Sequence, residues 1–453
     1  MGAAIMPKLM FADTICLERH VVRGVPDYVD RDRWLATVAL CSLVATGVLL
    51  GSKGTATAQS VVVMKNVNGG DVVLNNQQDV TLPSNATQSA GTSGLVQGES
   101  LGHDWKLLER VTNGGAVTIT NSGRLLSNVP QTGGLSALSR GGEGAILPTN
   151  SGAIALSLGG SAGAVTVYNS ASITTTGASA AGISASSVGG TGGDGFRTDL
   201  ENWPPLKSGG PVSIVMQRDA AQTAPAISTG GDNAAGIRAL SAGGGDLAEY
   251  QRRTGRIQAV SGGNAAGVSV DLGFAVVNTS GSQSPGVLAQ SIGGASGRSL
   301  EDKAGQHGGD GSSISLSGEA ASSVTTQGTH SDALLLQSFG GSGGNGSSAT
   351  GHVAVGGDGG RGGSAGSVTV NFRGALRTYA DHALGLMVQS IGGGGGRGGN
   401  ATAEGLFSAV AIGGSGGDGG RAGALDLAFG NITTAGSFSH GVNAQSIGGG
   451  GGH

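Results

Sequence analysis

The amino-acid sequence predicts an all-β protein, a right-handed parallel β-helix (β-solenoid) with long glycine-rich loops. Three observations support this fold class. Short segments recur at a spacing of about fifty residues, they alternate apolar and polar residues, and runs of glycine separate them. Alternation with period two indicates a strand with one buried face. Repeats of this length are typical of stacked units that share one core.

The composition excludes several other classes. The 453 residues include 92 glycines, but only 3% are aromatic and 12% are charged, so an ordinary globular core is not expected. Disordered chains are usually rich in charge and proline, whereas only 10 residues here are proline. Collagen is excluded because glycine does not recur strictly at every third position.

The clearest repeat is a short segment that ends in Gln-Ser-Ile/Phe-Gly-Gly. Its strong copies are Gly286–Gly294, Leu334–Gly341, Leu386–Gly393 and Gly441–Gly449. Weaker copies are Gly134–Gly142, Gly152–Gly160, Gly182–Gly190 and Gly236–Gly244. The aligned serines are Ser139, Ser157, Ser187, Ser241, Ser291, Ser338, Ser390 and Ser446. From Ser187 onward their spacing varies from 47 to 56 residues, which predicts fixed strands joined by tolerant loops.

Two more strands complete each predicted coil. Segments such as Gly163–Val167, Gly366–Val370 and Gly423–Leu427 supply one, and Ser172–Gly177 or Asn431–Gly436 supply the other. Stacked coils pair each strand with its copies above and below. Ile183, Val287, Ala289 and Ser291 are expected to face inward, and the Gln-Ser pairs are expected to form stacked polar ladders.

The segments after each Gly-Gly are expected to be variable loops, and the glycines are expected to lie mainly in corners and loops. Gly341–Ser364 and Gly392–Gly423 are nearly all glycine, serine and alanine, whereas Phe196–Gly209 and Asp246–Arg256 are polar. A short helix is predicted within Asp246–Arg256. Variable insertions on one face of a solenoid are its usual binding surface.

Residues 1–58 are predicted to be an extended signal peptide, followed by the mature repeats at 59–453. An uncharged run, Trp34–Gly51, lies between Arg33 and the small-residue site Ala56-Thr57-Ala58. The alternative is an uncleaved signal anchor, because 18 residues also reach the lower limit of a membrane span. Both cysteines, Cys16 and Cys41, precede the cleavage site. The expected location is therefore the periplasm, the cell surface and outer membrane, or the medium.

Charge and motifs point away from several functions. The net charge is −4 and no basic stripe is present, so no nucleic-acid partner is expected. Metal-binding histidine spacings and nucleophile motifs on strands are not found. The chain is therefore predicted not to be an enzyme, and no catalytic, cofactor-binding or metal residues and no cofactors are assigned.

Two alternatives use acidic residues. Gly-Asp-Gly recurs around Asp194, Asp310, Asp358 and Asp418, which suits a calcium-binding repeat, although turns in which aspartate bonds its own backbone are favoured. A polysaccharide-acting β-helix enzyme would need paired carboxylates. The local acidic clusters for that function are Asp199 with Glu201 and Asp246 with Glu249.

The repeated Ala-Gln-Ser-Ile-Gly-Gly pattern, the long signal and the cysteine-free, glycine-rich body resemble the passenger region of bacterial autotransporters (type V secretion). The resemblance covers residues 59–453. It implies a β-helix outside the outer membrane that functions in adhesion or aggregation, with host or bacterial surface molecules as partners. The family's β-barrel translocator is not found before His453, so a truncated passenger with a missing or separate translocator is expected. Mycobacterial-type glycine-rich surface proteins share the glycine tracts but not the signal or the Gln-Ser-Ile-Gly-Gly strand.

Overall fold

The computed structural model describes residues 62–66, 69–82, 93–102, 112–143, 146–148, 154–156, 159–190, 208–245, 262–296, 304–405 and 408–453. The predicted signal segment 1–58, most of Phe196–Gly209 and all of Asp246–Arg256 lie outside these residues. Every regular element described is a β-strand. None of the described residues belongs to a helix of the length and apolarity that a membrane crossing requires.

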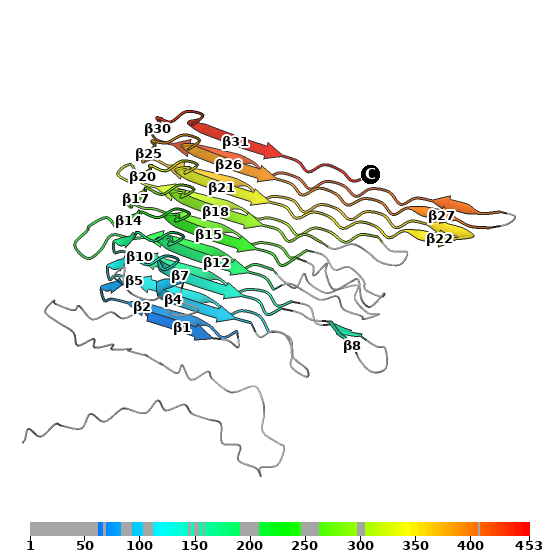
Figure 1. Ribbon diagram of the computed structural model, residues 1–453, viewed down its shortest axis with the longest axis horizontal. Coiled ribbons are helices and arrows are strands. Elements are labelled where there is room, and N and C mark those ends of the chain that lie inside the picture. Colours follow the sequence, from blue (N-terminus) through cyan, green and yellow to red (C-terminus); the bar gives the residue numbers. More distant parts are fainter. Residues whose placement is uncertain are drawn as a thin grey trace, which may run out of the picture. The chain divides into compact units, whose positions relative to one another are not determined.

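The described strands form a right-handed parallel β-helix with three long sheets (Figure 1). Sheet A contains β1 (Val62–Asn66), β4 (Gly94–Leu101), β7 (Gly133–Arg140), β12 (Ile183–Val188), β15 (Ile237–Ala242), β18 (Val287–Ile292), β21 (Leu334–Phe339), β26 (Leu386–Ile391) and β31 (Val442–Ile447). Sheet B contains β2 (Val72–Asn76), β5 (Val117–Asn121), β10 (Val165–Asn169), β13 (Val212–Met216), β16 (Val268–Asp271), β19 (Ile314–Gly318), β24 (Val368–Phe372) and β29 (Leu425–Phe429). Sheet C contains β3 (Val80–Leu82), β6 (Leu125–Ser127), β11 (Ile173–Thr175), β14 (Ala226–Thr229), β17 (Val276–Thr279), β20 (Ser323–Thr326), β25 (Ala375–Thr378) and β30 (Ile432–Thr434).

Each coil runs through sheet B, then sheet C, then sheet A, as the repeat pattern predicts. The pairing is in register along the stack, so that Ala185 lies beside Ala239 and Ala239 beside Ala289. Alternate residues point into one continuous aliphatic core between the sheets. Ile183, Val287, Ala289 and Ser291 are fully buried, which confirms their predicted inward positions.

One predicted copy of the repeat is wrong. The segment Gly152–Gly160 does not add a strand to sheet A. Its residues Ile154–Leu156 form β9, which pairs antiparallel with β8 (Ile146–Pro148) in a separate hairpin. The stack instead continues through β4, whose Ser100 lies beside Ser139, although its sequence lacks the Gly-Gly ending. Ser157 lies outside the described residues.

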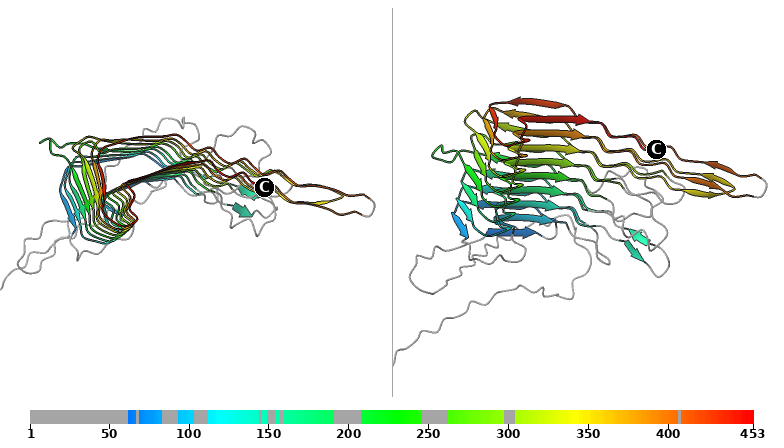
Figure 2. Two further views of the ribbon diagram at one scale, coloured as in Figure 1. Left: turned by 90° about the horizontal axis from the view of Figure 1, so that it is seen from above. Right: turned by 45° about the horizontal axis from the view of Figure 1, so that its top comes forward.

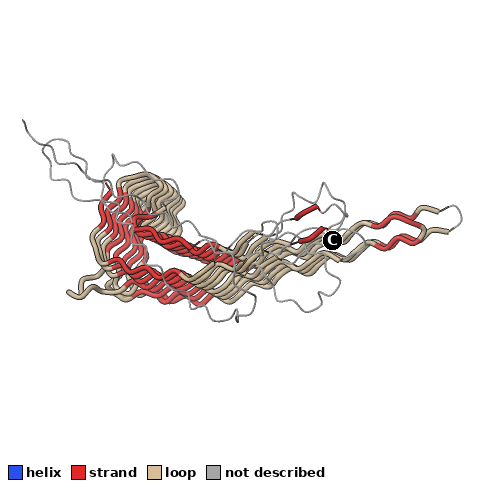
Figure 3. The backbone as a smooth tube through the Cα atoms, turned by 90° about the horizontal axis from the view of Figure 1, so that it is seen from below, coloured by secondary structure: helices blue, strands red, loops and turns tan. Residues whose placement is uncertain are grey.

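The glycine-rich segments are regular, which the sequence interpretation did not anticipate. Outgoing arms follow the strands of sheet A (293–296, 340–348, 392–400 and 448–453), and returning arms lead back to sheet B (304–313, 356–367 and 413–424). Seen along the stack, the arms of successive coils run closely parallel (Figures 2 and 3). Their far ends carry β22 (Ala349–Gly351) paired with β27 (Ala401–Ala403), and β23 (Val353–Val355) paired with β28 (Val410–Ile412).

The hydrogen bonds of the arms repeat every third residue. The N–H groups of Gly340, Gly343 and Gly346 donate to carbonyls of the next coil at 2.8–2.9 Å. Gly341 and Gly344 donate instead to a returning arm, also at 2.8–2.9 Å. A period of three with bonds only to neighbouring segments is the geometry of polyproline II-type helices packed side by side. The arms are therefore a hydrogen-bonded bundle of polyglycine helices.

Close packing explains the glycines of this bundle. A Cβ atom on Gly396 would lie 1.9 Å from the carbonyl oxygen of Gly344. A Cβ on Gly394 would meet only Gly450 O, at 3.8 Å. The Gly-Gly-x pattern thus places two glycines inside the bundle and one residue on its surface. Glycine in these loops serves mainly for close approach between neighbouring segments, a role that the sequence interpretation did not predict when it placed glycine mainly in corners and loops.

Candidate functional site: a groove beside sheet A

The outer face of sheet A presents the side chains that alternate with the core residues. One outward position of the paired strands forms a column, which includes Ser136, Ser184, Arg238 and Leu288 in adjacent coils. Ser136 is buried, Ser184 and Leu288 are half-buried, and Arg238 is exposed. Parallel, in-register pairing therefore converts one sequence position into a continuous row along the solenoid axis.

A turn between sheets C and A supplies a second row beside this face. Its residues have left-handed backbone with φ between 55° and 61° in seven coils of the described chain, although none is glycine. They are Gln131, Ser179, Asn233, Gln283, His330, His382 and Phe438. We call them the left-handed column. Backbone N–H groups of this column donate to carbonyl oxygens of the next coil, for example Asn233 N to Ser282 O at 2.9 Å.

A groove of about 470 Å³ lies between the left-handed column and the outer face of sheet A. Its walls carry amide groups from the column, serine hydroxyls from β7 and β12, and aliphatic surface from Leu138, Pro285 and Leu288. Arg238 is the one charged residue among the described residues that line it. The lining therefore combines neutral hydrogen-bonding groups, apolar surface and a single cation.

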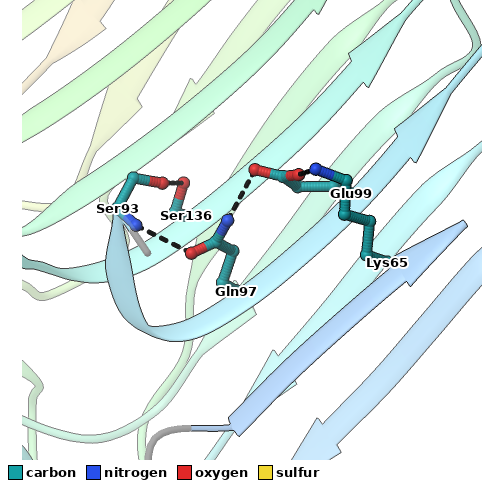
Figure 4. Close-up of polar contacts among 5 residues, drawn as sticks. All are labelled: Lys65, Ser93, Gln97, Glu99 and Ser136. Carbon is teal, nitrogen blue, oxygen red and sulfur yellow. Dashed lines mark hydrogen bonds and ion pairs between the residues drawn. The ribbon is translucent and has the colours of Figure 1, made fainter. Parts of the chain in front are cut away.

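A chain of polar contacts runs from the groove residues Ser93 and Ser136 to Lys65 on β1 (Figure 4). The hydroxyls of Ser93 and Ser136 lie 2.7 Å apart, and Ser93 N donates to Gln97 Oε1 at 2.7 Å. Gln97 Nε2 donates to Glu99 Oε1 at 2.5 Å, and Glu99 Oε2 pairs with Lys65 Nζ at 3.2 Å. Since Gln97 and Glu99 are only 1% and 8% exposed, these mutual bonds satisfy groups that water barely reaches.

At the other end the left-handed column becomes aromatic. The imidazole rings of His330 and His382 stack with centroids 4.9 Å apart, and Phe438 stacks on His382 at 5.1 Å. Asp332 is buried near His330, and its Oδ1 accepts the N–H of Leu384 at 2.7 Å. Burial raises the pKa of the Asp332 carboxyl, against smaller lowering effects of this hydrogen bond and of the charge of His330.

The predicted glutamine ladder is confirmed. Gln290 Nε2 donates to Gln337 Oε1 at 2.8 Å, and the same bond continues at 2.7 Å to Gln389 and from there to Gln445. The aligned serines behave differently, because they bond to backbone groups just before the sheet B strands rather than to one another. Ser291 Oγ donates to Ala266 O at 3.0 Å and accepts Ser312 N–H at 2.8 Å.

The aspartates considered for calcium make contacts of another kind. Asp310 Oδ1 accepts the N–H of Ser364 at 2.6 Å, and Asp358 Oδ1 accepts that of Ser415 at 2.8 Å. These bonds join one coil to the next, so the expected aspartate turn, with its bond to the local backbone, is wrong at both positions. Asp418 occupies an exposed place in the last returning arm.

The other acidic candidates are not placed. Asp194, Asp199, Glu201, Asp246 and Glu249 lie outside the described residues. Within the described residues, no three His, Cys, Asp or Glu side chains gather closely enough to hold a metal ion.

The sequence interpretation missed the groove. A signal was present before six of the seven left-handed residues, where glycine or alanine stands two positions earlier, as in Gly231-Asp232-Asn233 and Gly281-Ser282-Gln283. Comparisons with protein-family models, curated protein sequences and solved structures gave no match to this chain.

Proposed function

We propose that this chain is an exported structural protein of a bacterial surface that acts in adhesion or aggregation, like the passenger region of an autotransporter. The observation that supports it most is the groove beside sheet A, which continues along stacked coils as rows of aligned side chains. Solenoids commonly bind partners on such extended surfaces. The proposed partners are host or bacterial surface molecules and a separate outer-membrane β-barrel translocator, and nucleic acid is not among them.

The proposed role is binding rather than catalysis. The groove is lined by amides, hydroxyls, aliphatic side chains and Arg238, without a carboxylate or histidine among its described lining residues. General acid–base chemistry ordinarily uses such titratable groups. This lining suits recognition of a surface polymer by hydrogen bonds and apolar contact.

Adhesion can be measured directly. Beads coated with the full chain should attach to bacteria or to epithelial cells more than albumin-coated beads, and the free chain should compete with this attachment. Equal attachment of both kinds of bead to both cell types would contradict the proposed function.

The proposed export has its own test. When the chain is produced in a Gram-negative host, N-terminal sequencing of exported material should begin at Gln59, directly after the predicted site Ala56–Ala58. An intact N-terminus on membrane-bound material would identify the signal anchor instead. Retention of all of the chain in the cytoplasm would contradict export.

A further inference from the structure

We propose that the groove beside sheet A binds an anionic polysaccharide, with its hydroxyl groups bonded to the amide and serine side chains and its acidic groups paired with Arg238. This inference rests on the proposed adhesive function and names its class of ligand. Two independent observations carry it. They are the residue choice in the left-handed column and the chemistry of the groove lining.

The left-handed column contains residues with a Cβ atom at positions where the backbone conformation favours glycine. Left-handed backbone is unfavourable for residues that have a Cβ atom, and glycine adopts it readily. Glycine fills 92 positions of this chain, yet none of the seven left-handed turn positions in the described coils. Asparagine and histidine tolerate this conformation better than most residues, but glutamine does not share that tendency. Since Gln131 and Gln283 occupy two of these positions, the side chains themselves have a use there.

That use points to a ligand, because the column side chains that reach the groove have no hydrogen-bond partner among the described residues. Gln131, Asn233 and Gln283 line the groove and are exposed. Glutamine and asparagine each offer two donors and one acceptor, which is the complement of vicinal sugar hydroxyls. Strained backbone residues that persist against their conformational cost are commonly found at ligand-binding positions.

Arg238 gives the groove its preference for negative charge. Arg238 is exposed and lines the groove, and no carboxylate is among the described residues that line it. A guanidinium binds carboxylate or sulfate groups through two parallel hydrogen bonds. The aliphatic surface of Leu138, Pro285 and Leu288 can cover the C–H faces of sugar rings.

The direction of the groove favours a polysaccharide over a peptide. Successive coils repeat at about 4.8 Å, close to the length of one pyranose unit. A peptide strand that binds by β-augmentation needs a free sheet edge. Within this part of the stack the strands of sheet A are already paired on both sides, as β15 is with β12 and β18.

The test measures binding of the full chain to polymers by calorimetry. Hyaluronan and polygalacturonate are the anionic probes, dextran is the neutral probe and poly-glutamate is the anionic peptide. We expect both anionic glycans to bind, and dextran and poly-glutamate to bind at least tenfold more weakly. Arg238→Gln should weaken binding of the anionic glycans at least tenfold.

A second variant separates binding from folding. The double variant Asn233→Gly/Gln283→Gly should bind at least tenfold more weakly, while its melting temperature stays equal or rises because glycine relieves the left-handed backbone. Gln222→Gly is the matched control. Gln222 is also left-handed, with φ of 60°, but lies in a turn outside the groove lining. This control should retain full binding.

Three results would overturn the proposal: no binding of either anionic glycan, unchanged binding by the double glycine variant, or equal binding of poly-glutamate. The outcomes also separate this inference from the adhesive function. If coated beads adhere but the groove variants bind glycans and cells unchanged, only the groove assignment fails. If glycans bind in the groove but beads do not adhere, the adhesive function fails instead.

Discussion

The hydroxyl of Ser338 on sheet A accepts a hydrogen bond from the backbone N–H of Gly366 at 2.8 Å, although 28 residues separate them. The same hydroxyl donates to the carbonyl of Ser312 at 2.9 Å. One fully buried side chain therefore satisfies two backbone groups that lie at the entry to sheet B in successive coils. Ser187 and Ser390 make equivalent contacts, so the aligned serines link sheet A to the backbone at the start of sheet B by hydrogen bonds.

Replacing this serine should destabilise the fold. Ser338→Ala leaves the N–H of Gly366 and the carbonyl of Ser312 without their partner, at a cost of about 1–3 kcal/mol. Ser315→Ala is the matched control, because Ser315 is exposed on the outer face of β19. Urea unfolding followed by circular dichroism checks both variants. Equal midpoints would show that the serine hydroxyl does not matter to stability.

The glycines of the arms should differ sharply in their tolerance of a methyl group. Gly396→Ala places Cβ 1.9 Å from the carbonyl oxygen of Gly344, so backbone must move and a cost of about 1–3 kcal/mol is expected. Gly394→Ala, two residues earlier, meets no atom closer than 3.8 Å. Hydrogen exchange in the arms should accelerate in the first variant only. Similar exchange in both would argue against the polyglycine bundle.

Phe372 depends on the absence of side chains at Gly318. This ring is fully buried, and a Cβ on Gly318 would approach it to 2.5 Å. Gly318→Ala should therefore destabilise through overpacking, and Phe372→Leu should destabilise through a cavity. Since the new methyl group partly fills that cavity, the double variant should be more stable than the sum of the single effects predicts. Additive changes in the free energy of unfolding would contradict this coupling.

Asp332 should make the fold less stable as pH rises. Its folded-state pKa is raised by burial. The contribution of Asp332 to the free energy of unfolding is therefore fully present below the pKa of the unfolded state, about 3.9. That contribution is lost as pH rises through the pKa of the folded state. Asp332→Asn keeps an oxygen for the N–H of Leu384 but cannot ionise. It should raise the melting temperature at pH 7 by an amount that shrinks toward pH 3.

Asp381→Asn is the matched control for that prediction. Asp381 is exposed, and its Oδ1 makes the same kind of contact to the next coil, with Ser437 N at 2.7 Å. Thermal unfolding from pH 3 to pH 8 compares the two variants with the parent chain. A stabilisation by Asp332→Asn that is the same at every pH would not come from ionisation.

The sequence by itself determined the coil. Alternation in segments such as Gly366–Val370 placed the sheet B strands to within two residues, and the aligned serines predicted the register of sheet A from Ser187 to Ser446. These features are local or recur with each coil, so they can be recognised in the amino-acid sequence alone. The antiparallel β9 was misassigned because its sequence, Ile-Ala-Leu, matches the repeat, whereas the strand pairs with β8 instead of joining sheet A.

Only the tertiary structure decided what the glycine tracts and the groove are. Gly396 is constrained by Gly344 of the preceding coil, and Asn233 and Gln283 line one groove only because the coils stack in register. The small residue two positions before most of the left-handed residues marks a turn in the sequence, but it does not reveal the groove. Both features arise from contacts between residues about fifty positions apart. Strand periodicity predicts that such coils stack, but it does not predict which atoms come into contact.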